Sequence, residues 1–368
     1  MEYLRDKSEY FDLDADFKPL PKYGHLSEKT PEYIAVESAI DAAYSPLWAS
    51  PDFAAFRQAA GDPDAALPPG GPDRYRDITT ELLQFPARDG HLNELKVYKS
   101  HNVAPDATLV YRMHGGGMEH RTQLPFLSYT LLTFCILGFV IGRHEVDGAE
   151  NVYAATNPNI VVVSVDYRLA PEFPFPRPVE DCYDGLLWCK ENAEILGVNP
   201  EKIIVAGSSA GGNLASVMAI MARKNGISGI IAQVLHFPTV CHPKFFPRDK
   251  YEYGSYIQNS ENPVLSTLRM EAFLRAYNPN PKPDYRQSPL LAESLTNLPP
   301  ALIQCAGYDI LRDDAFAYAE ALKAAGVDVE IYGYQGVPHC FPAVILTHPS
   351  TPIFYKRFNG FLTKHATA

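Results

Sequence analysis

The chain of 368 residues lacks the signals that direct a protein out of the cell. Its N-terminus, MEYLRDKSEYFD, carries charges of both signs and no apolar stretch of the kind that a secretory signal requires. No Asn-x-Ser/Thr site with a residue other than proline in the middle occurs, and the final HATA matches no lipidation or retention motif. These absences predict a cytoplasmic protein.

Cysteines are few and stand singly along the chain. There are six, and no two form a C-x-x-C pair. In a chain of this length, that distribution predicts reduced and mostly buried thiols instead of disulfides or a metal site. The cysteines are Cys135, Cys182, Cys189, Cys241, Cys305 and Cys340.

The chain also has fewer positively than negatively charged residues. Lysine and arginine number 32 against 43 aspartates and glutamates, for a net charge of −11. Such a chain has no basic footprint for nucleic acid or for an anionic membrane, so we expect neither as a partner. The hydrophobic share of 46% and the aromatic share of 12% support a large folded core and exclude a disordered chain. The composition specifies no oligomeric state.

The first part of the chain has helical patterns that end in a hinge. Residues 31–44 and 51–60 are predicted helices, and proline and glycine dominate residues 61–73. We therefore expect an N-terminal helical cap segment and hinge over residues 1–75, followed by a second domain over residues 76–368.

From residue 76 onward, short strand-like runs alternate with helical patterns. The first two runs, residues 78–87 and 92–99, meet at Asp89-Gly90, a typical hairpin turn. Alternation after a single hairpin predicts an α/β fold, in which helices cover both faces of a mostly parallel sheet. Residues 237–287 interrupt the alternation and are expected to form a cap insertion. Later strands are expected at residues 108–113, 160–165, 202–206, 230–235, 301–305 and 329–334, and helices at 177–196, 210–224, 313–325 and 352–365.

A G-x-S-x-G motif lies between one of these strands and one of these helices. GSSAG at residues 207–211 directly follows KIIVA and leads into a helix rich in alanine and methionine. This is the context that a nucleophile elbow requires, because Gly207 and Gly211 occupy positions too tight for a Cβ. The register assigns the nucleophile to Ser209 and not to Ser208. Ser209 would lie at a helix N-terminus, where free N–H groups favour negative charge. The alternative is a glycine-rich loop that merely starts a helix.

A second glycine cluster follows the strand TLVYRM and comprises His114, Gly115, Gly116 and Gly117. Consecutive glycines let backbone N–H groups approach an oxygen without obstruction by side chains. Motifs of this HGGG type supply oxyanion donors in lipases and esterases. Together with the N–H of Ala210, two or three donors would converge on the negatively charged oxygen of a tetrahedral intermediate.

The acid and the base of such a site are expected after the nucleophile, in loops that follow later strands. Asp309 lies in the first loop after the strand at residues 301–305, where the acid belongs. Asp313 and Asp314 are rivals, but they fall where the next helix starts and are better interpreted as N-terminal caps. His339 follows the last strand and is the expected base.

Together these blocks resemble those of the hormone-sensitive lipase family of α/β-hydrolases. The resemblance implies an eight-stranded α/β-hydrolase core over residues 76–368, capped by the N-terminal segment and by residues 237–287. It also implies hydrolysis of a carboxylic ester without a metal or a cofactor. The matching stretches are HGGG (114–117), VDYRLAPEFPFP (165–176), GSSAGG (207–212), GYDILRD (307–313) and PHCF (338–341).

The resemblance also implies a role for single residues. Ser209, Asp309 and His339 match the family's catalytic triad. Many members have Asp or Thr before the nucleophile, where this chain has Ser208. The residues that match the oxyanion donors are Gly116, Gly117 and Ala210. The positions that we interpret as structural are Asp166, Arg168 and Glu172.

We therefore expect a serine hydrolase that acts on a small-molecule ester through an acyl-enzyme. The ester would carry a short-to-medium acyl group or be a natural product. Two alternatives use the same fold: a lyase or cyclase acting on a natural product, and a non-catalytic ligand receptor. The presence of the whole triad favours hydrolysis. Aromatic residues of the cap either line an acyl pocket or pack in the cap interior; they are Phe245, Phe246, Tyr251, Tyr253 and Tyr256.

A long uncharged run separates Arg121 from Arg143. It has 21 residues, of which 124–142 are mostly apolar, and such a run is long enough to cross a membrane. A span there would put HGGG and Ser209 on opposite sides of a bilayer, so we expect no membrane span. Removing residues 118–138 would join HGGG to FVIG, which resembles the family's usual continuation. We interpret residues 118–138 as an atypical apolar insertion, either a retained intron or a lid at the pocket mouth.

Overall fold

The computed structural model describes residues 2–15, 21–60, 66–115, 117–119, 133–135 and 139–367. At its centre lies an eight-stranded sheet with the strand order β1-β2-β6-β3-β7-β8-β9-β10. The strands are β1 (Ile78–Pro86), β2 (Leu92–Ser100), β3 (Ala107–Met113), β6 (Ile160–Asp166), β7 (Val198–Ser208), β8 (Ile230–His236), β9 (Ala301–Ala306) and β10 (Val329–Tyr334).

The sheet is antiparallel at one edge and parallel elsewhere. β1 and β2 form the predicted hairpin, β2 is antiparallel to β6, and the remaining neighbours are parallel. The central strands β3 and β6 are buried along almost their whole length, as strands covered on both faces must be. The edge strand β1 is mostly exposed. The predicted α/β fold with a mostly parallel sheet is confirmed.

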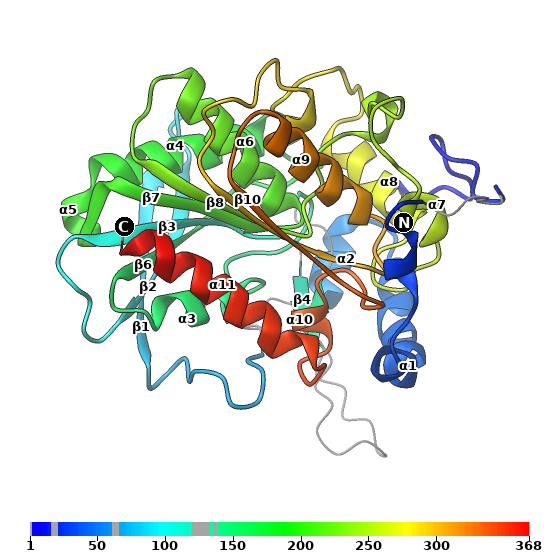
Figure 1. Ribbon diagram of the computed structural model, residues 1–368, viewed down its shortest axis with the longest axis horizontal. Helices are drawn as coiled ribbons and strands as arrows, with labels where there is room; N and C mark the ends of the chain where they lie inside the picture. Colours follow the sequence, from blue (N-terminus) through cyan, green and yellow to red (C-terminus); the bar gives the residue numbers. More distant parts are fainter. Residues whose placement is uncertain are drawn as a thin grey trace.

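Helices cover both faces of this sheet (Figure 1). α4, α6 and α9 lie on one face, whereas α3 and α11 lie on the other. α6 follows β7 directly and packs against β7 and β8, so its N-terminus lies at the carboxyl end of the central strands. The helices of these layers are α3 (Gly148–Ala155), α4 (Arg177–Glu191), α5 (Ala193–Leu196), α6 (Ala210–Lys224), α9 (Arg312–Ala324) and α11 (Ser350–Ala366).

The N-terminal helices pack against the excursion between β8 and β9, at the right of Figure 1. The rings of Trp48 and Phe53 lie 5.3 and 5.4 Å from the ring of Phe273. α1 ends at Trp48, beyond the predicted end at residue 44, because the buried Trp48 ring belongs to this aromatic contact. The elements concerned are η1 (Gly24–Ser27), α1 (Pro31–Trp48), α2 (Phe53–Ala60), η2 (Pro243–Phe245), α7 (Ser255–Gln258), α8 (Thr267–Tyr277) and η3 (Pro289–Leu291); α10 (Phe341–Val344) follows β10.

Parts of the predicted insertion at 118–138 belong to two short strands. β4 (Gly117–Glu119) pairs antiparallel with β5 (Thr133–Cys135), and the rest of that prediction lies outside the described residues.

Within the described ranges, every helix is too short or too polar to cross a membrane. The predicted burial of the thiols is seen at five cysteines: Cys182, Cys189, Cys241, Cys305 and Cys340.

Arg57 in α2 joins the N-terminal helices to the loops at the carboxyl end of the sheet. Its Nε donates a hydrogen bond of 2.7 Å to the carbonyl of Val140, and Nη2 donates to the carbonyl of Ala170. Its guanidinium also forms a two-pronged ion pair with Glu172, at 2.7 and 2.9 Å. Glu172, which we interpreted as structural, thus helps to hold the N-terminal segment on the sheet.

We expect Arg57→Ala to lower the free energy of unfolding by about 1.5–3 kcal/mol, because it leaves two carbonyls and a carboxylate without their donor. The matched control is Arg76→Ala. The Arg76 side chain is mostly exposed and pairs with the adjacent Asp77, so its loss should leave the free energy of unfolding close to that of the wild type. Urea unfolding measures both, and equal effects of the two changes would contradict this role of Arg57.

Candidate active site

The turn between β7 and α6 presents Ser209 at the carboxyl end of the sheet. Ser209 has φ +57° and ψ −117°, a backbone conformation that side-chain-bearing residues rarely adopt. A Cβ on Gly207 would collide with the carbonyl of Gly211, and a Cβ on Gly211 would collide with the carbonyl of Met113. The two glycines of the motif are therefore required by the close approach of three backbone segments.

Ser209, His339 and Asp309 form a continuous hydrogen-bonded path. Nε2 of His339 lies 2.9 Å from Oγ of Ser209, and Nδ1 of His339 lies 2.7 Å from Oδ2 of Asp309. All three side chains are fully buried. Oδ1 of Asp309 accepts the backbone N–H of Leu311, which fixes the carboxylate in the loop after β9. The arrangement has the geometry of a nucleophile, a base and an acid that orients the base.

The rival carboxylates have other partners. Asp313 accepts the backbone N–H groups of Gly254 and Ser255, both at 2.8 Å, and Asp314 accepts the N–H of Val240 at 3.0 Å. The interpretation of both as N-terminal caps was wrong, because α9 begins at Arg312 and they lie inside its first turn. Instead, they hold the excursion between β8 and β9 against the start of α9.

The HGGG loop packs directly on the nucleophile turn. A Cβ on Gly115 would meet the carbonyl of Ser208, so the two loops touch through their backbones. The ring of His114 stacks on Tyr167 at 4.2 Å, and the hydroxyl of Tyr167 donates to the carbonyl of His114. This contact holds the start of the glycine loop in place.

Of the three predicted oxyanion donors, two belong to the described residues. Ala210 is the first residue of α6, where a backbone N–H has no acceptor within the helix. Gly117 begins β4 and is paired with Cys135 of β5. Gly116 lies outside the described residues.

A buried ionic cluster, which the sequence analysis missed, lies beneath both loops. Nη2 of Arg112 contacts Glu150, lies 2.9 Å from Oδ2 of Asp147 and donates to Oγ of Ser208 at 3.0 Å. Ser208 in turn donates to Glu150 at 3.2 Å, and Nδ1 of His236 lies 3.0 Å from Glu150. The cluster therefore connects β3, α3, β8 and the residue before the nucleophile. The available signal was Arg112 itself, because an arginine inside a mostly apolar strand of a buried sheet requires a buried counter-charge.

The cluster also reaches the glycine loop, because Oδ2 of Asp147 accepts the backbone N–H of Gly115 at 3.3 Å. Burial raises the pKa of Asp147 to about 7, although the Arg112 guanidinium opposes this shift. Burial also disfavours the charged form of Glu150, but Arg112 and the hydrogen bond with His236 outweigh it and lower its pKa to about 2. Burial lowers the pKa of His236. Of the two carboxyl groups, Glu150 is the one whose charged form the cluster favours.

The aromatic side chains of the predicted cap insertion contact one another. Three of the aromatic residues of the predicted cap insertion pack on one another: Phe246 stacks on Tyr253 at 3.6 Å, and Tyr253 lies 4.7 Å from Tyr256. This geometry favours the interpretation of these three as interior packing. Among the described residues, one group has the composition of a metal site: Glu94, His144 and Asp166.

Known proteins share both the sequence and the fold of this chain. A family model described as the alpha/beta hydrolase fold matches residues 138–343. An AB hydrolase superfamily protein of Schizosaccharomyces pombe is 32% identical over 271 residues, which cover 72% of this chain and 73% of that protein. Esterase LipI of Mycobacterium tuberculosis is 39% identical over 209 residues, which cover 55% of this chain and 62% of that protein.

Two solved structures are similar over almost the whole chain. An ester hydrolase from the metagenome of Lake Arreo has a TM-score of 0.74 and 28% identity, covering 92% of this chain and 100% of that one. Vibralactone cyclase has a TM-score of 0.73 and 26% identity, covering 93% of this chain and 96% of that one. With the family model and the relatives, these similarities confirm the resemblance drawn from the motifs. The chain belongs to the hormone-sensitive lipase family of α/β-hydrolases.

Proposed function

We propose that this carboxylic ester hydrolase uses Ser209 as its nucleophile, His339 as its general base and acid, and Asp309 to orient His339. The observation that carries the proposal is the hydrogen-bonded path from Asp309 through His339 to Ser209. The substrate is a small-molecule ester with a short-to-medium acyl group or a natural-product ester, and relatives named as esterases support this class.

In the proposed reaction, His339 carries each proton between Ser209, the leaving alcohol and water. Nε2 of His339 takes the proton of Ser209 as Oγ attacks the ester carbonyl, and Asp309 stabilises the imidazolium that forms. The imidazolium then gives its proton to the leaving alcohol oxygen, and an acyl-enzyme remains on Ser209. Water, deprotonated by His339, attacks the acyl carbon, and the acid leaves as Ser209 recovers its proton.

Backbone N–H groups bind the oxygen that becomes negative in both steps. We assign this role to Gly116, Gly117 and Ala210, with Ala210 at the positive end of α6. Residues 1–75 and 237–287 form the cap over this site. The contacts of Phe273 with Trp48 and Phe53 support the association of these two segments.

A second reaction is favoured by the similarity to vibralactone cyclase. If the acyl group carries its own hydroxyl, that hydroxyl takes the place of water at the acyl-enzyme. His339 removes the hydroxyl proton and returns it to Ser209, and the product is a lactone instead of an acid. The same triad serves both reactions, so the fate of the acyl-enzyme distinguishes them.

We expect Ser209→Ala to lower kcat/KM for p-nitrophenyl butyrate by about 10⁴–10⁶-fold, because it removes the nucleophile. The matched control is Ser216→Ala. Ser216 is a buried serine further along α6 whose hydroxyl donates to the carbonyl of Asn213, so its loss should leave turnover close to wild type. Wild-type turnover in the Ser209 variant would overturn the assignment of the nucleophile.

Isotope labelling separates hydrolysis from cyclisation. With a hydroxy-acyl ester in ¹⁸O-labelled water, hydrolysis incorporates one labelled oxygen into the acid, because water is the second nucleophile. Mass spectrometry of the products is the measurement, and we expect labelled acid to predominate. An unlabelled lactone as the main product would instead establish the second reaction.

The buried ionic cluster is expected to hold the nucleophile turn through Ser208. Ser208→Ala leaves Arg112 and Glu150 without one buried hydrogen-bond partner, so we expect the free energy of unfolding to fall by about 1–3 kcal/mol. The loss of kcat should be smaller than for Ser209→Ala, since the nucleophile remains. Urea unfolding and p-nitrophenyl butyrate assays test this. Unchanged stability would show that the turn does not depend on the cluster.

A further inference from the structure

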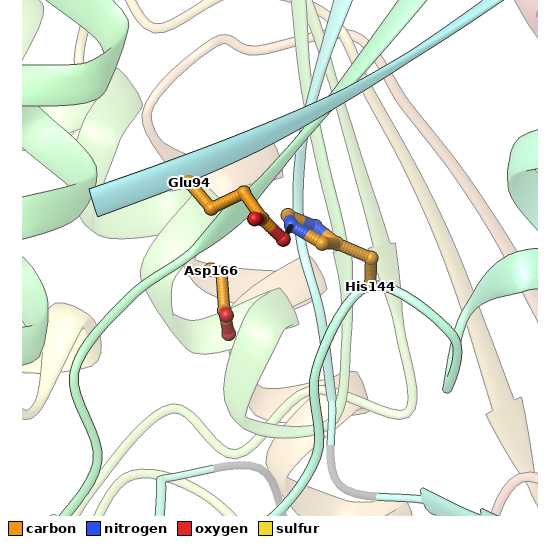
Figure 2. Close-up of side chains that lie close together, drawn as sticks. All are labelled: Glu94, His144 and Asp166. Carbon is orange, nitrogen blue, oxygen red and sulfur yellow. Dashed lines mark ion pairs between the residues drawn. The ribbon is translucent and has the colours of Figure 1, made fainter. Parts of the chain in front are cut away.

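Glu94, His144 and Asp166 lie close together (Figure 2), and Asp166 also lies beside the HGGG loop, with its Oδ1 3.9 Å from Nε2 of His114. Glu94 on β2 and Asp166 at the end of β6 are direct partners across the antiparallel strands, and His144 comes from the loop before α3. One ligand atom from each lies within 4.8 Å of the other two. Figure 2 shows the carboxylate of Glu94 directed at the His144 ring, with Asp166 beside them.

The His144 ring has an unused nitrogen that faces this group. The side chain is 1% exposed, and its Nδ1 lies 3.1 Å from Oγ of Ser164. Its Nε2 is buried and has no hydrogen-bond partner, and it lies 3.5 Å from Oε1 of Glu94. In the tautomer that carries its proton on Nδ1, the ring donates to Ser164, and Nε2 presents a lone pair on the side of Glu94.

The carboxylates already share one cation. Arg143 lies 3.0 Å from Glu94 and 2.8 Å from Asp166. Its side chain is 44% exposed and lines a surface cleft of about 550 Å³, which Glu94 and Asp166 also line. The guanidinium can therefore swing into solvent, and the cleft provides a path by which an ion reaches both carboxylates.

We propose that Glu94, His144 and Asp166 bind a divalent transition-metal ion such as Zn²⁺, which displaces Arg143 from the two carboxylates. One imidazole nitrogen and two carboxylate oxygens suit Zn²⁺ better than Mg²⁺ or Ca²⁺, which prefer oxygen ligands alone. Bonds of about 2.0–2.2 Å require the side chains to close by about 1 Å around the ion. Water completes the coordination from the cleft.

The position of the site suggests a structural role. A metal on Glu94 and Asp166 would cross-link β2 to β6 and to the His144 loop. The next residue, Tyr167, stacks on His114 and donates to its carbonyl, so the ion would stiffen the support of the HGGG loop. Ester hydrolysis by the triad needs no metal, so the test of this site does not depend on the proposed function.

The test is isothermal titration of the EDTA-treated full chain with ZnCl₂. We expect saturable binding of one Zn²⁺ per chain at this site, a rise in Tm, and at least tenfold weaker binding of Mg²⁺. His144→Phe removes the nitrogen ligand and should weaken Zn²⁺ binding at least tenfold. Glu94→Gln should do the same, and because Glu94 is partly exposed on a strand, this variant keeps the test valid if the His144 variant fails to fold.

Two further variants distinguish this site from nonspecific surface binding. Arg143→Ala removes the competing cation and should strengthen Zn²⁺ binding about tenfold. Glu172→Gln is the matched control, since Glu172 lines the same cleft but is paired with Arg57, and it should leave the affinity unchanged. Lack of Zn²⁺ binding, or binding that is unchanged in both the Glu94 and His144 variants, would overturn the proposal.

Discussion

Three backbone segments meet at the carboxyl end of the sheet without room for a side chain between them. Gly207 approaches Gly211 across the turn, Gly211 approaches the end of β3 at Met113, and Gly115 approaches Ser208. This contact forces Ser209 to a positive φ, which points its hydroxyl away from the sheet and toward His339. The same contact sets the glycine loop beside the first turn of α6. The positions of Ser209 and of the first N–H groups of α6 are thus consequences of one close approach.

The buried ionic cluster around Arg112 supports this close approach of the three backbone segments. Arg112 is fully buried in the central strand β3, and its desolvation is tolerable only because Glu150 and Asp147 surround it. The charged groups also form hydrogen bonds to the two loops: Arg112 donates to Ser208, and Asp147 accepts the N–H of Gly115. Removing one partner therefore does more than weaken an ion pair: it leaves a buried charge and frees a loop that the active site needs. The fold and the proposed chemistry share this cluster.

The sequence predicted what depends on local pattern and fixed order. The alternation of strands and helices predicted the α/β fold. The order of serine, acid and histidine along the chain predicted the three residues that hydrogen bonds join in the structure. The sequence did not predict contacts between residues that lie far apart in the chain. Asp313 and Asp314 look like helix caps in sequence, yet they bind backbone N–H groups more than fifty residues away. The partners of Arg112 come from two other segments, the start of α3 and the end of β7, and no spacing in the sequence indicates these contacts.

The central claim is that Ser209 is a nucleophile activated by His339. Its most direct test is labelling of the native protein with a fluorophosphonate, followed by mass spectrometry of the peptides. The account predicts one adduct per chain, on Ser209, and a loss of labelling by orders of magnitude in His339→Ala. An adduct on another residue, or labelling of Ser209 at the same rate without His339, would contradict the account.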